Sequence, residues 1–529
     1  MSMPNPTAGS PDHTLKVFSF NVWGLAFISK DRHARIRAIA EYLASSNYDI
    51  VCLQELWVYK DYEIVREEIL QNLPFSRFFH TGALGSGLAI FTRFPLIAAQ
   101  ALPYSLSGSP AQAIAGDFFV KKAAANIVIL HPVLGEVEIW NTHMHAAGEH
   151  PPDTRQAHRI AQSWQLANAI RSGAAKGRYI LAMGDFNSQP WSVPVGILRH
   201  HANLSDSFLD VHPNANNYAS PHPSAVDALS RYGMTCDSNL NTWSADKNIP
   251  DNVQEQGGKR LDYIFYRQPA IARRRPLVWG YRDDVGEEDS GDAQNGELSG
   301  DGHLEAGKPI PHSIAKAPRL RCVKSEVVLT ERVPGQAFSY SDHFALFSTF
   351  TIDPADKPKP SETGPTASSS SSQGQSSFTP LVPLITQTEP EQVNANTTTF
   401  APYDPFGSPT SARRSSSSLS TVKSSTVRNA LNTLRLYTRI SQKTAQQHLK
   451  ICAAAIVALI ALTIGSAWQP KSWLQPIFTL VGGLLGAAGA TFLYTGFVWG
   501  RWEEGLLKEV TEEMELELRV VEMEEKVNA

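Results

Sequence analysis

The sequence is poor in cysteine, and the four cysteines it has form no recognisable pair. Cys52, Cys236, Cys322 and Cys452 are spread over 529 residues. Zinc ligands and redox pairs usually stand only a few positions apart, so this spacing argues against both. We interpret the cysteines as reduced thiols of a protein that folds in the cytosol. Residues 1–13 also lack the apolar run of a secretory signal, and we expect them to be disordered.

The chain lacks an excess of positive charge as well. Its 47 lysines and arginines are outnumbered by 51 acidic residues, which gives a formal net charge of -4. Proteins that bind nucleic acid usually present a basic stripe. We therefore expect no nucleic-acid partner, and the charge balance argues against a nuclease.

Residues 14–352 carry the pattern of one large folded domain. Short runs rich in β-branched and aromatic residues, such as LKVFSF at 15–20 and RYILAMG at 178–184, indicate strands. Between such runs, stretches such as residues 154–171 repeat apolar side chains at helical spacing. This alternation predicts an α+β sandwich. Residues 283–313 are acidic and glycine-rich without an aromatic side chain, so we expect a disordered insertion there.

Three further kinds of segment follow the domain. Residues 353–429 are rich in serine, proline, threonine and glutamine, which predicts a disordered linker. We expect a basic helix at 430–450. Residues 451–468 and 473–499 are almost entirely apolar, and each is close to the ~20 residues that cross a bilayer. They predict a transmembrane hairpin. A buried hairpin of a soluble core is the alternative, but no domain adjoins these stretches to bury them.

Basic residues predict how this hairpin is oriented. Residues 411–450 contain eight lysines and arginines and no acid, whereas the loop between the spans contains only Lys471. Since positive segments stay on the cytosolic side, we expect the large domain and the tail in the cytosol, and the hairpin in the endoplasmic reticulum. The tail, residues 500–529, is acidic and has one apolar stripe that includes Leu507 and Met514. Two interpretations fit this stripe, a contact with a partner helix or a solvated amphipathic helix, and we favour the second.

Polar residues of the kinds that hold metals and phosphates end several of the predicted strands. In the run YILAMGDFNSQP at 179–190, Asp185 and Asn187 would point to the same side of an extended chain and address one ligand. The alternative is a turn in which both residues bond their own backbone. Similar positions are taken by Asn21 in FNVWG, Glu55 in CLQEL, His143 in NTHMHA, Asp262 in RLDY, and Asp342 and His343 in SDH. A set of this size predicts one shared site.

The order of these motifs resembles the DNase I-like endonuclease/exonuclease/phosphatase superfamily. More narrowly, it resembles the neutral sphingomyelinase and inositol phosphosphingolipid phospholipase C family. The segments that carry the resemblance are FNVWGL, CLQELW, GSGLAIFTRFP, GDFF with Lys122, NTHMHA, GDFNSQP, KRLDYIFYR and the apolar hairpin. They cover residues 15–352 and 449–500. The resemblance implies a four-layer α/β/β/α sandwich followed by the linker and the two-helix transmembrane hairpin. Lys121 departs from it, because a small residue is expected before Lys122.

The resemblance also implies an activity and a substrate. The chain would be a membrane-anchored, Mg²⁺-dependent phospholipase C, with Mn²⁺ as the alternative ion. It would hydrolyse a phosphosphingolipid to ceramide and a phosphorylated headgroup, either phosphocholine or an inositol phosphate. Basic residues near the membrane, Lys121 and Lys122 among them, would attract anionic phospholipids as activators.

Roles for the metal and the general base follow from residue chemistry together with the resemblance. Glu55, with Asn21 nearby, can provide oxygen ligands for a hard divalent cation. His343 is the best general base, because an imidazole can take a proton from water at neutral pH. The resemblance implies that Asp262 pairs with His343 and that Asp342 lies beside the metal and the substrate.

The remaining residues of the predicted site act on the phosphate. Asp185 and Asn187 would hold the nucleophilic water and a phosphate oxygen, and His143 would donate a hydrogen bond to the phosphate. Lys122 and Asn187 would contact the substrate. His145 lies on the same predicted strand face as His143, and we interpret it as structural.

Two rival functions use the same sequence features. An inositol-polyphosphate phosphatase of the same superfamily would apply the metal and the histidines to a monoester. A membrane-tethered scaffold with an inactive enzyme domain would recruit partners through its linker and tail. We disfavour the scaffold because the base and every metal ligand expected for catalysis are present.

Overall fold

The computed structural model describes most of the predicted domain and the whole C-terminal helical region. The described residues are 13–83, 85–108, 110, 119–146, 153–216, 222–245, 247–269, 318–353 and 416–528. Our expectations for the N-terminal segment, the acidic insertion and most of the linker concern residues outside this set.

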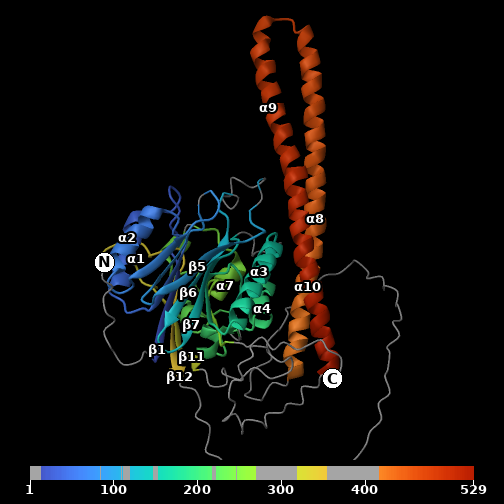
Figure 1. The fold of residues 1–529 in the computed structure, drawn as a ribbon. Helices are drawn as coiled ribbons and strands as arrows, with labels where there is room; N and C mark the ends of the chain where they lie inside the picture. Colours follow the sequence, from blue (N-terminus) through green and yellow to red (C-terminus); the bar gives the residue numbers. More distant parts are fainter. Residues whose placement is uncertain are drawn as a thin grey trace, which may run out of the picture.

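Two six-stranded mixed sheets pack face to face at the centre of the domain (Figure 1). The first has the strand order β11-β12-β1-β2-β4-β3, and the second has the order β5-β6-β7-β8-β10-β9. The strands are β1 Thr14–Asn21, β2 Ile50–Gln54, β3 Phe75–Phe79, β4 Leu88–Thr92, β5 Leu96–Pro103, β6 Ala123–His131, β7 Gly135–His143, β8 Tyr179–Asp185, β9 Ser205–Asp206, β10 Asp262–Arg267, β11 Arg319–Val328 and β12 Ala345–Asp353.

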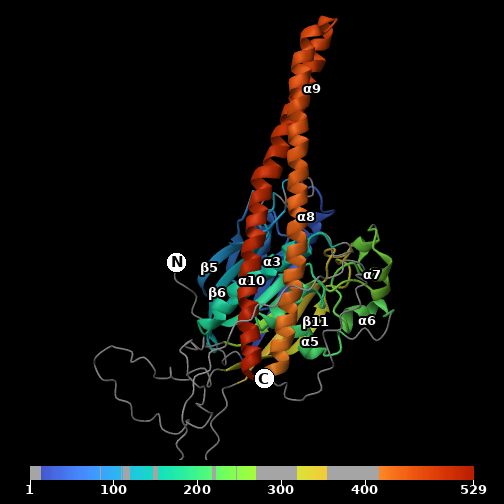
Figure 2. The same cartoon turned by 90° about the vertical axis from the view of Figure 1, so that its right-hand side faces the viewer.

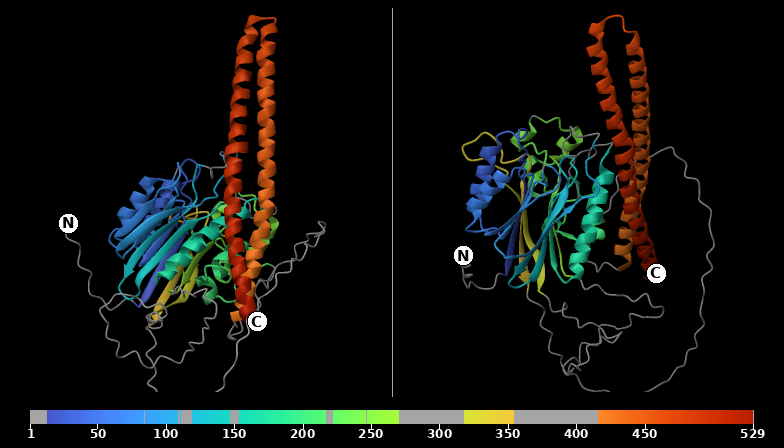
Figure 3. Two further views of the ribbon diagram at one scale, coloured as in Figure 1. Left: turned by 45° about the vertical axis from the view of Figure 1, so that its right-hand side comes forward. Right: turned by 45° about the horizontal axis from the view of Figure 1, so that its top comes forward.

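Helices cover the outer faces of both sheets and complete four layers (Figure 3). Helices α1 (Arg32–Ala44) and α2 (Tyr59–Ile69) pack on the first sheet, whereas α3 (Gln156–Ala175) and α4 (Val193–His200) pack on the second. One apolar core lies between the sheets, and one lies under each helical layer. The predicted four-layer sandwich is therefore confirmed. Shorter helices, α5 Ser207–Val211, α6 Ala225–Ser230 and α7 Asp251–Gln256, lie in the connections.

Four strands were not visible in the sequence pattern. β5 and the first half of β6 are rich in alanine, which has a low strand propensity. β3 has five residues and β9 has two, so neither shows a clear alternation. Pairing with neighbouring strands therefore decides their conformation, and this pairing is not visible in a short local window.

Two parallel strand pairs bring their carboxyl ends to one edge of the sandwich. β1 lies parallel to β2, and β7 lies parallel to β8 with His143 opposite Asp185. A 2.9 Å hydrogen bond from Asn21 to Asp185 joins the edges of the two sheets. Polar residues that follow these strands therefore meet at this edge, which we call the site end of the domain.

Two long helical rods follow the domain (Figures 1 and 2). α8 (Ser416–Gly465) begins inside the segment predicted as linker, and it continues through the predicted basic helix into the first apolar stretch. α9 (Gln475–Leu493), a π-helical segment (Tyr494–Trp499) and α10 (Gly500–Asn528) form the second rod. Each rod contains a stretch long and apolar enough to cross a membrane. Only 11% of this stretch is buried in the first rod and 6% in the second.

The tail helix α10 does not have the solvated form that we favoured. Leu507 and Met514 of its apolar stripe are fully buried, and both belong to the core that contains α3 and α4. Glu517 accepts a 2.5 Å hydrogen bond from Lys423 of α8 and lies 3.3 Å from His201 of the domain. The tail therefore pairs with a helix of its own chain. The sequence pattern did not show this partner because it lies far away along the chain.

We expect Met514→Ala to loosen the tail. The substitution should cost about 2–5 kcal/mol, because it removes a fully buried side chain and leaves a cavity. Hydrogen exchange of the α10 amides in the full chain would measure this loss as faster opening. Met523→Ala on the same helix is the matched control, since Met523 is 55% exposed. Equal exchange rates in the two variants would contradict the docking of α10.

Candidate active site

Three strands of the second sheet deliver polar side chains to one point at the site end. β7 ends at His143 and β8 ends at Asp185, and these residues stand opposite each other. β10 begins at Asp262, which is opposite Asp185 on its other side. The strand pairing itself therefore brings together three predicted residues that are distant in sequence. All three are almost completely buried.

The first sheet contributes Asn21 and Glu55 to the same point. The Asn21 side-chain amide donates to Glu55 Oε1 at 3.2 Å and to Asp185 Oδ2 at 2.9 Å. Glu55 directly follows β2 and has a φ of 58°, a left-handed conformation that is uncommon for such a side chain. The backbone turn at Glu55 therefore directs its carboxylate toward the other sheet.

His343 and Asp262 form a buried pair. Asp262 Oδ2 lies 2.9 Å from His343 Nδ1, and His343 Nε2 lies 3.9 Å from Asp185 Oδ2. His343 is 7% exposed. In this geometry Nδ1–H of His343 donates to Asp262 and Nε2 is directed at the carboxylate of Asp185, as a base oriented by an acid requires.

The surroundings of His343 raise its pKa well above 6.5. Burial alone would lower this pKa, but the hydrogen bonds to Cys236 and Asp262 and the charge of Asp262 outweigh it. Burial also raises the pKa of the Cys236 thiol, so that sulfur is uncharged at neutral pH. The Asp262 carboxylate is therefore the negative charge that stabilises the imidazolium.

His143 lies on the other side of the acids and beside a lysine. The Lys122 ammonium is 2.9 Å from His143 Nε2, and that nitrogen is 3.6 Å from Asp185 Oδ2 and 3.8 Å from Glu55 Oε1. Burial lowers the pKa of His143 well below 6.5, and the charge of Lys122 acts in the same direction. His143 is therefore a neutral imidazole next to a fixed positive charge. The indole of Trp57 lies 6.3 Å from the His143 ring, a contact that the sequence did not suggest.

We expected Asp185 and Asn187 to point to the same side of one strand, but they do not. β8 ends at Asp185, and Asn187 follows in a left-handed conformation with a φ of 46°. Asp185 Oδ1 accepts from the Asn187 backbone N–H at 2.9 Å, and the Asn187 side chain donates to the Met144 carbonyl at 3.1 Å. The turn that we gave as the alternative is therefore the arrangement that forms. It uses Oδ1 of Asp185 and leaves Oδ2 facing Asn21 and the two histidines.

Asp342 is near the site but is neutralised by a residue that the sequence did not single out. Lys247 lies 3.0 Å from Asp342 and 3.3 Å from Asp237, and Lys259 holds Asp237 at 2.9 Å. The charge of Asp342 still helps to raise the pKa of Glu55. No local motif surrounds Lys247 or Asp237, so only their positions in space connect them to the site.

His145 has the environment of a structural residue. It is 2% exposed, and its ring lies 5.3 Å from the ring of His158. Burial lowers the pKa of His145 to about 2, and Arg155 adds to this shift. The ring is therefore neutral and packs beneath the site.

The acids of the site suit a divalent cation. Burial raises the pKa of Glu55, with Asp342 adding to the effect, and it raises the pKa of Asp185 to about 7, with Asp262 adding. A cation held by Glu55 and Asp185 would stabilise the ionised form of both carboxylates. Asp185, Asp262 and His343 also place ligand atoms within 4.8 Å of one another. Because His343 already binds Asp262, we interpret those two residues as an acid and base pair instead of metal ligands.

The orientation of Asn21 bears on its predicted role. Its amide nitrogen stands between the carboxylates of Glu55 and Asp185, and its oxygen accepts from the Trp23 backbone N–H at 3.0 Å. The nitrogen therefore takes the place between the acids that suits a cation. Asn21 would fit as a metal ligand after its amide turns over, whereas Glu55 fits as it stands.

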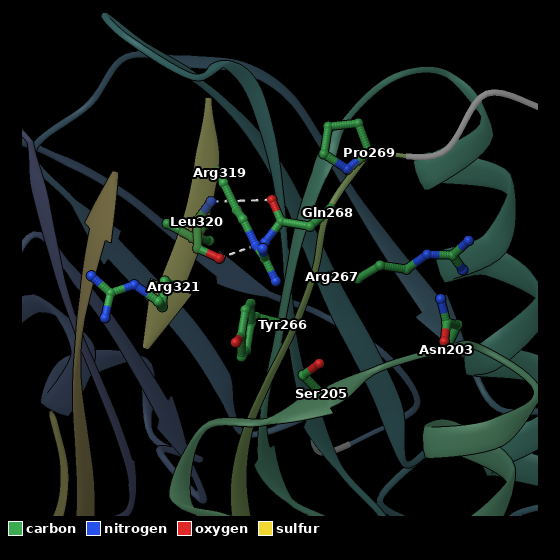
Figure 4. Close-up of a pocket in the computed structure, with 9 residues that line it drawn as sticks. All are labelled: Asn203, Ser205, Tyr266, Arg267, Gln268, Pro269, Arg319, Leu320 and Arg321. Carbon is green, nitrogen blue, oxygen red and sulfur yellow. Dashed lines mark hydrogen bonds between the residues drawn. The ribbon is translucent and has the colours of Figure 1, made fainter. Parts of the chain in front are cut away.

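A separate cavity of about 220 Å³ lies at the opposite end of β10 (Figure 4). Its lining residues include Arg267, Arg319 and Arg321. Arg267 donates to the carbonyl of Ala202, and Arg321 pairs with Asp353. β10 runs from Asp262 at the site to Arg267 at this cavity, so the cavity is not part of the site.

Comparison with known proteins assigns the chain to a family. A model described as the Endonuclease/Exonuclease/phosphatase family matches residues 18–343. A Schizosaccharomyces pombe protein named inositol phosphosphingolipids phospholipase C is 34% identical over 343 residues, which are 64% of this chain and 68% of that protein. The Saccharomyces cerevisiae protein of the same name is 32% identical and matches 48% of this chain and 57% of its own length. Human sphingomyelin phosphodiesterase 2 is 31% identical and matches 37% of this chain and 46% of its own length.

These matches differ in extent. Those to the budding-yeast and human proteins cover less than two thirds of each relative, whereas the fission-yeast match covers more. The family model spans the sandwich from β1 to His343 and so contains every residue of the candidate site. The chain therefore belongs to the endonuclease/exonuclease/phosphatase family, with inositol phosphosphingolipid phospholipases C and neutral sphingomyelinases among its relatives.

Proposed function

We propose that this chain is a metal-dependent phospholipase C that hydrolyses the phosphodiester of a phosphosphingolipid to ceramide and a phosphorylated headgroup. The observation that carries the proposal is the His343–Asp262 pair, which faces Asp185 across 3.9 Å in a buried acidic site. The names of the relatives supply the class of lipid.

The residues of the chain can activate and place a water molecule. Asp262 accepts a hydrogen bond from Nδ1–H of His343, so above the pKa of His343 its unprotonated Nε2 can accept a proton from the attacking water. Asp185 Oδ2, 3.9 Å from Nε2, accepts a hydrogen bond from the same water and orients it. Asn187 fixes Asp185 through its backbone N–H, which keeps this carboxylate in place.

The other side of the site would receive the phosphate. His143 is neutral, so one of its nitrogens can donate a hydrogen bond to a phosphate oxygen. Lys122, 2.9 Å from His143, adds a positive charge there. A divalent cation such as Mg²⁺, held by Glu55 with Asn21 and Asp185 nearby, would act as a Lewis acid on the phosphodiester when bound.

The apolar helices suggest where the substrate is found. Both rods have a stretch that can cross a bilayer, and the domain packs directly against α8 and α10. A phosphodiesterase held in this way acts on headgroups at the surface of its own membrane. We place the domain in the cytosol and the hairpin in the endoplasmic reticulum, because basic residues precede the first span.

Release of the headgroup tests the proposal. Purified full-length protein is given sphingomyelin or an inositol phosphosphingolipid in vesicles, with Mg²⁺ or with a chelator, and the products are identified by mass spectrometry. We expect ceramide and one phosphorylated headgroup only when Mg²⁺ is present. If inorganic phosphate appears instead and the phosphodiesters stay intact, the chain is a phosphomonoesterase and the proposal is wrong.

The raised pKa of His343 predicts how activity depends on pH. Below this pKa, His343 carries a proton and cannot accept another, so kcat/KM should rise about tenfold per pH unit on the acid side. Asp262→Asn removes the charge that stabilises the imidazolium. Burial then dominates, the pKa of His343 falls, and the acid limb moves to lower pH while the maximal rate drops. A pH profile of kcat/KM for both proteins checks the direction, and an acid limb that moves to higher pH would refute this assignment.

We also expect anionic lipids to activate the enzyme through a defined set of basic residues. Lys423, Arg428 and Arg435 of α8 are paired with glutamates of α10, so they are not available to lipid. Lys443 and Lys450 are exposed and lie closer to the first span. Each should contribute ~1 kcal/mol at a negatively charged membrane surface.

Matched variants test this assignment. Lys443→Gln combined with Lys450→Gln should reduce the gain in rate between neutral and anionic vesicles, whereas Arg428→Gln should leave it unchanged. The same gain in all three proteins would refute the assignment.

A further inference from the structure

A short loop with an apolar tip stands at the rim of the candidate site. It joins β1 to α1 over residues 22–31, and Phe27 and Ile28 form its tip. Phe27 is fully exposed and Ile28 is 66% exposed. The Ser29 N–H donates to the Leu25 carbonyl at 3.0 Å, which closes the tip into a turn. Phe27 has a φ of 66°, which is rare for a bulky side chain.

The base of this loop is fixed to the site. The Gly24 N–H donates to the Glu55 carbonyl at 2.9 Å, and a Cβ on Gly24 would stand only 2.5 Å from that oxygen. The Arg35 guanidinium donates to the carbonyls of Val22 and Trp23 at 2.8 Å each, and it lies 4.8 Å from the Trp23 ring. The two apolar side chains are therefore presented by an anchored turn.

The site end of the domain is also the end nearest the apolar helices. Trp502, in the first turn of α10 after the second span, lies 5.7 Å from the ammonium of Lys121, which precedes Lys122 of the site. Glu517, roughly four turns farther from the span, contacts His201 at the end of α4, on the side of the domain that α3 and α4 cover. Figures 1 and 2 show the dark-blue loop after β1 at the edge of the domain from which α8 and α9 extend. A bilayer around those helices would face the loop.

We propose that Phe27 and Ile28 insert into the membrane that holds the C-terminal helices, and so keep the active site against the lipid surface. Transfer of exposed apolar area from water into the interfacial layer is favourable, and a fixed turn loses little conformational freedom on insertion. We infer that the loop binds the bilayer, because its tip is apolar and the apolar helices of the same chain extend from the same end of the domain.

A fluorescent label tests the insertion without measuring turnover. The four native cysteines are buried, so Phe27→Cys in the full chain can be labelled selectively with an environment-sensitive dye. In phosphatidylcholine proteoliposomes, we expect blue-shifted emission that spin-labelled lipids quench.

Leu70→Cys is the matched control for this label. Leu70 is 52% exposed and follows α2, and the next strand, β3, begins level with Ile50 at the end of the sheet opposite to the site. A label at this position should report water and escape quenching. Identical emission and quenching at positions 27 and 70 would overturn the proposal.

A second arm, which rests on the proposed function, measures activity. Phe27→Ser combined with Ile28→Ser should lower the hydrolysis of sphingolipid in bilayers by about tenfold, which corresponds to about 1.4 kcal/mol. Hydrolysis of a short-chain sphingolipid dispersed as monomers should stay unchanged. Equal bilayer rates in the variant and the wild type would overturn the role of the loop. A wild type that cleaves neither substrate would contradict the proposed function, and the label would still decide whether the loop inserts.

Discussion

His343→Ala should lower kcat by ~100- to 10,000-fold, the usual loss when a general base is removed. His343 Nε2 is the imidazole nitrogen directed at Asp185, and Asp262 already holds its Nδ1. Without the ring, the site loses the nitrogen that faces Asp185 and takes the proton from the water. The measurement is headgroup release from vesicles at saturating Mg²⁺, together with thermal unfolding of the same preparation.

Two further variants make this prediction decisive. His343→Ala leaves the buried Asp262 carboxylate without its histidine, which could unfold the site. His343→Gln keeps an N–H that can face Asp262, so it should preserve stability and still be inactive. His33→Ala on the exposed face of α1 should behave like the wild type. Activity of His343→Gln near the wild-type level would show that His343 is not the base.

The site residues could be found in the sequence because each stands close to where an apolar strand starts or stops. Asn21 and His143 end strands, and Glu55 follows one, and these strands are buried along most of their length. A polar side chain that ends a buried strand needs a partner, and several such residues imply a shared site. The pairing of the strands then brings these residues together.

The residues that adjust the site could not be found in this way. Lys247 neutralises Asp342, and Cys236 faces His343, but neither ends a strand or belongs to a motif. The docking of α10 on α3 was also invisible, since an apolar stripe shows only that a helix has a partner and not which one. Contacts between elements distant in sequence depend on the complete fold.

Glu55→Gln should reduce turnover by ~100-fold or more at a fixed low Mg²⁺ concentration. A neutral amide is a poorer ligand for a hard cation than a carboxylate. A Lewis-acid metal contributes several kcal/mol to catalysis, and each 1.4 kcal/mol or so is about tenfold in rate. Chelation of the metal should reduce the wild-type rate in the same way, and added Mg²⁺ should restore it. Glu326→Gln on β11, exposed and paired with Lys324, should leave the rate unchanged.

Although Glu55→Gln should lower the rate, it should make the folded chain more stable when metal is absent. Burial raises the pKa of Glu55, and the charge of Asp342 raises it further, so its ionised form is less favourable in the folded chain than in the unfolded chain. This destabilisation grows as pH rises above the unfolded pKa, and it is present at neutral pH. Glu55→Gln removes the charge and should raise Tm in the presence of a chelator. Mg²⁺ should then raise the Tm of the wild type more than that of the variant, because the cation binds the folded site with Glu55 as a ligand. If Mg²⁺ raised both Tm values equally, Glu55 would not hold the metal, and the raised pKa would need another explanation.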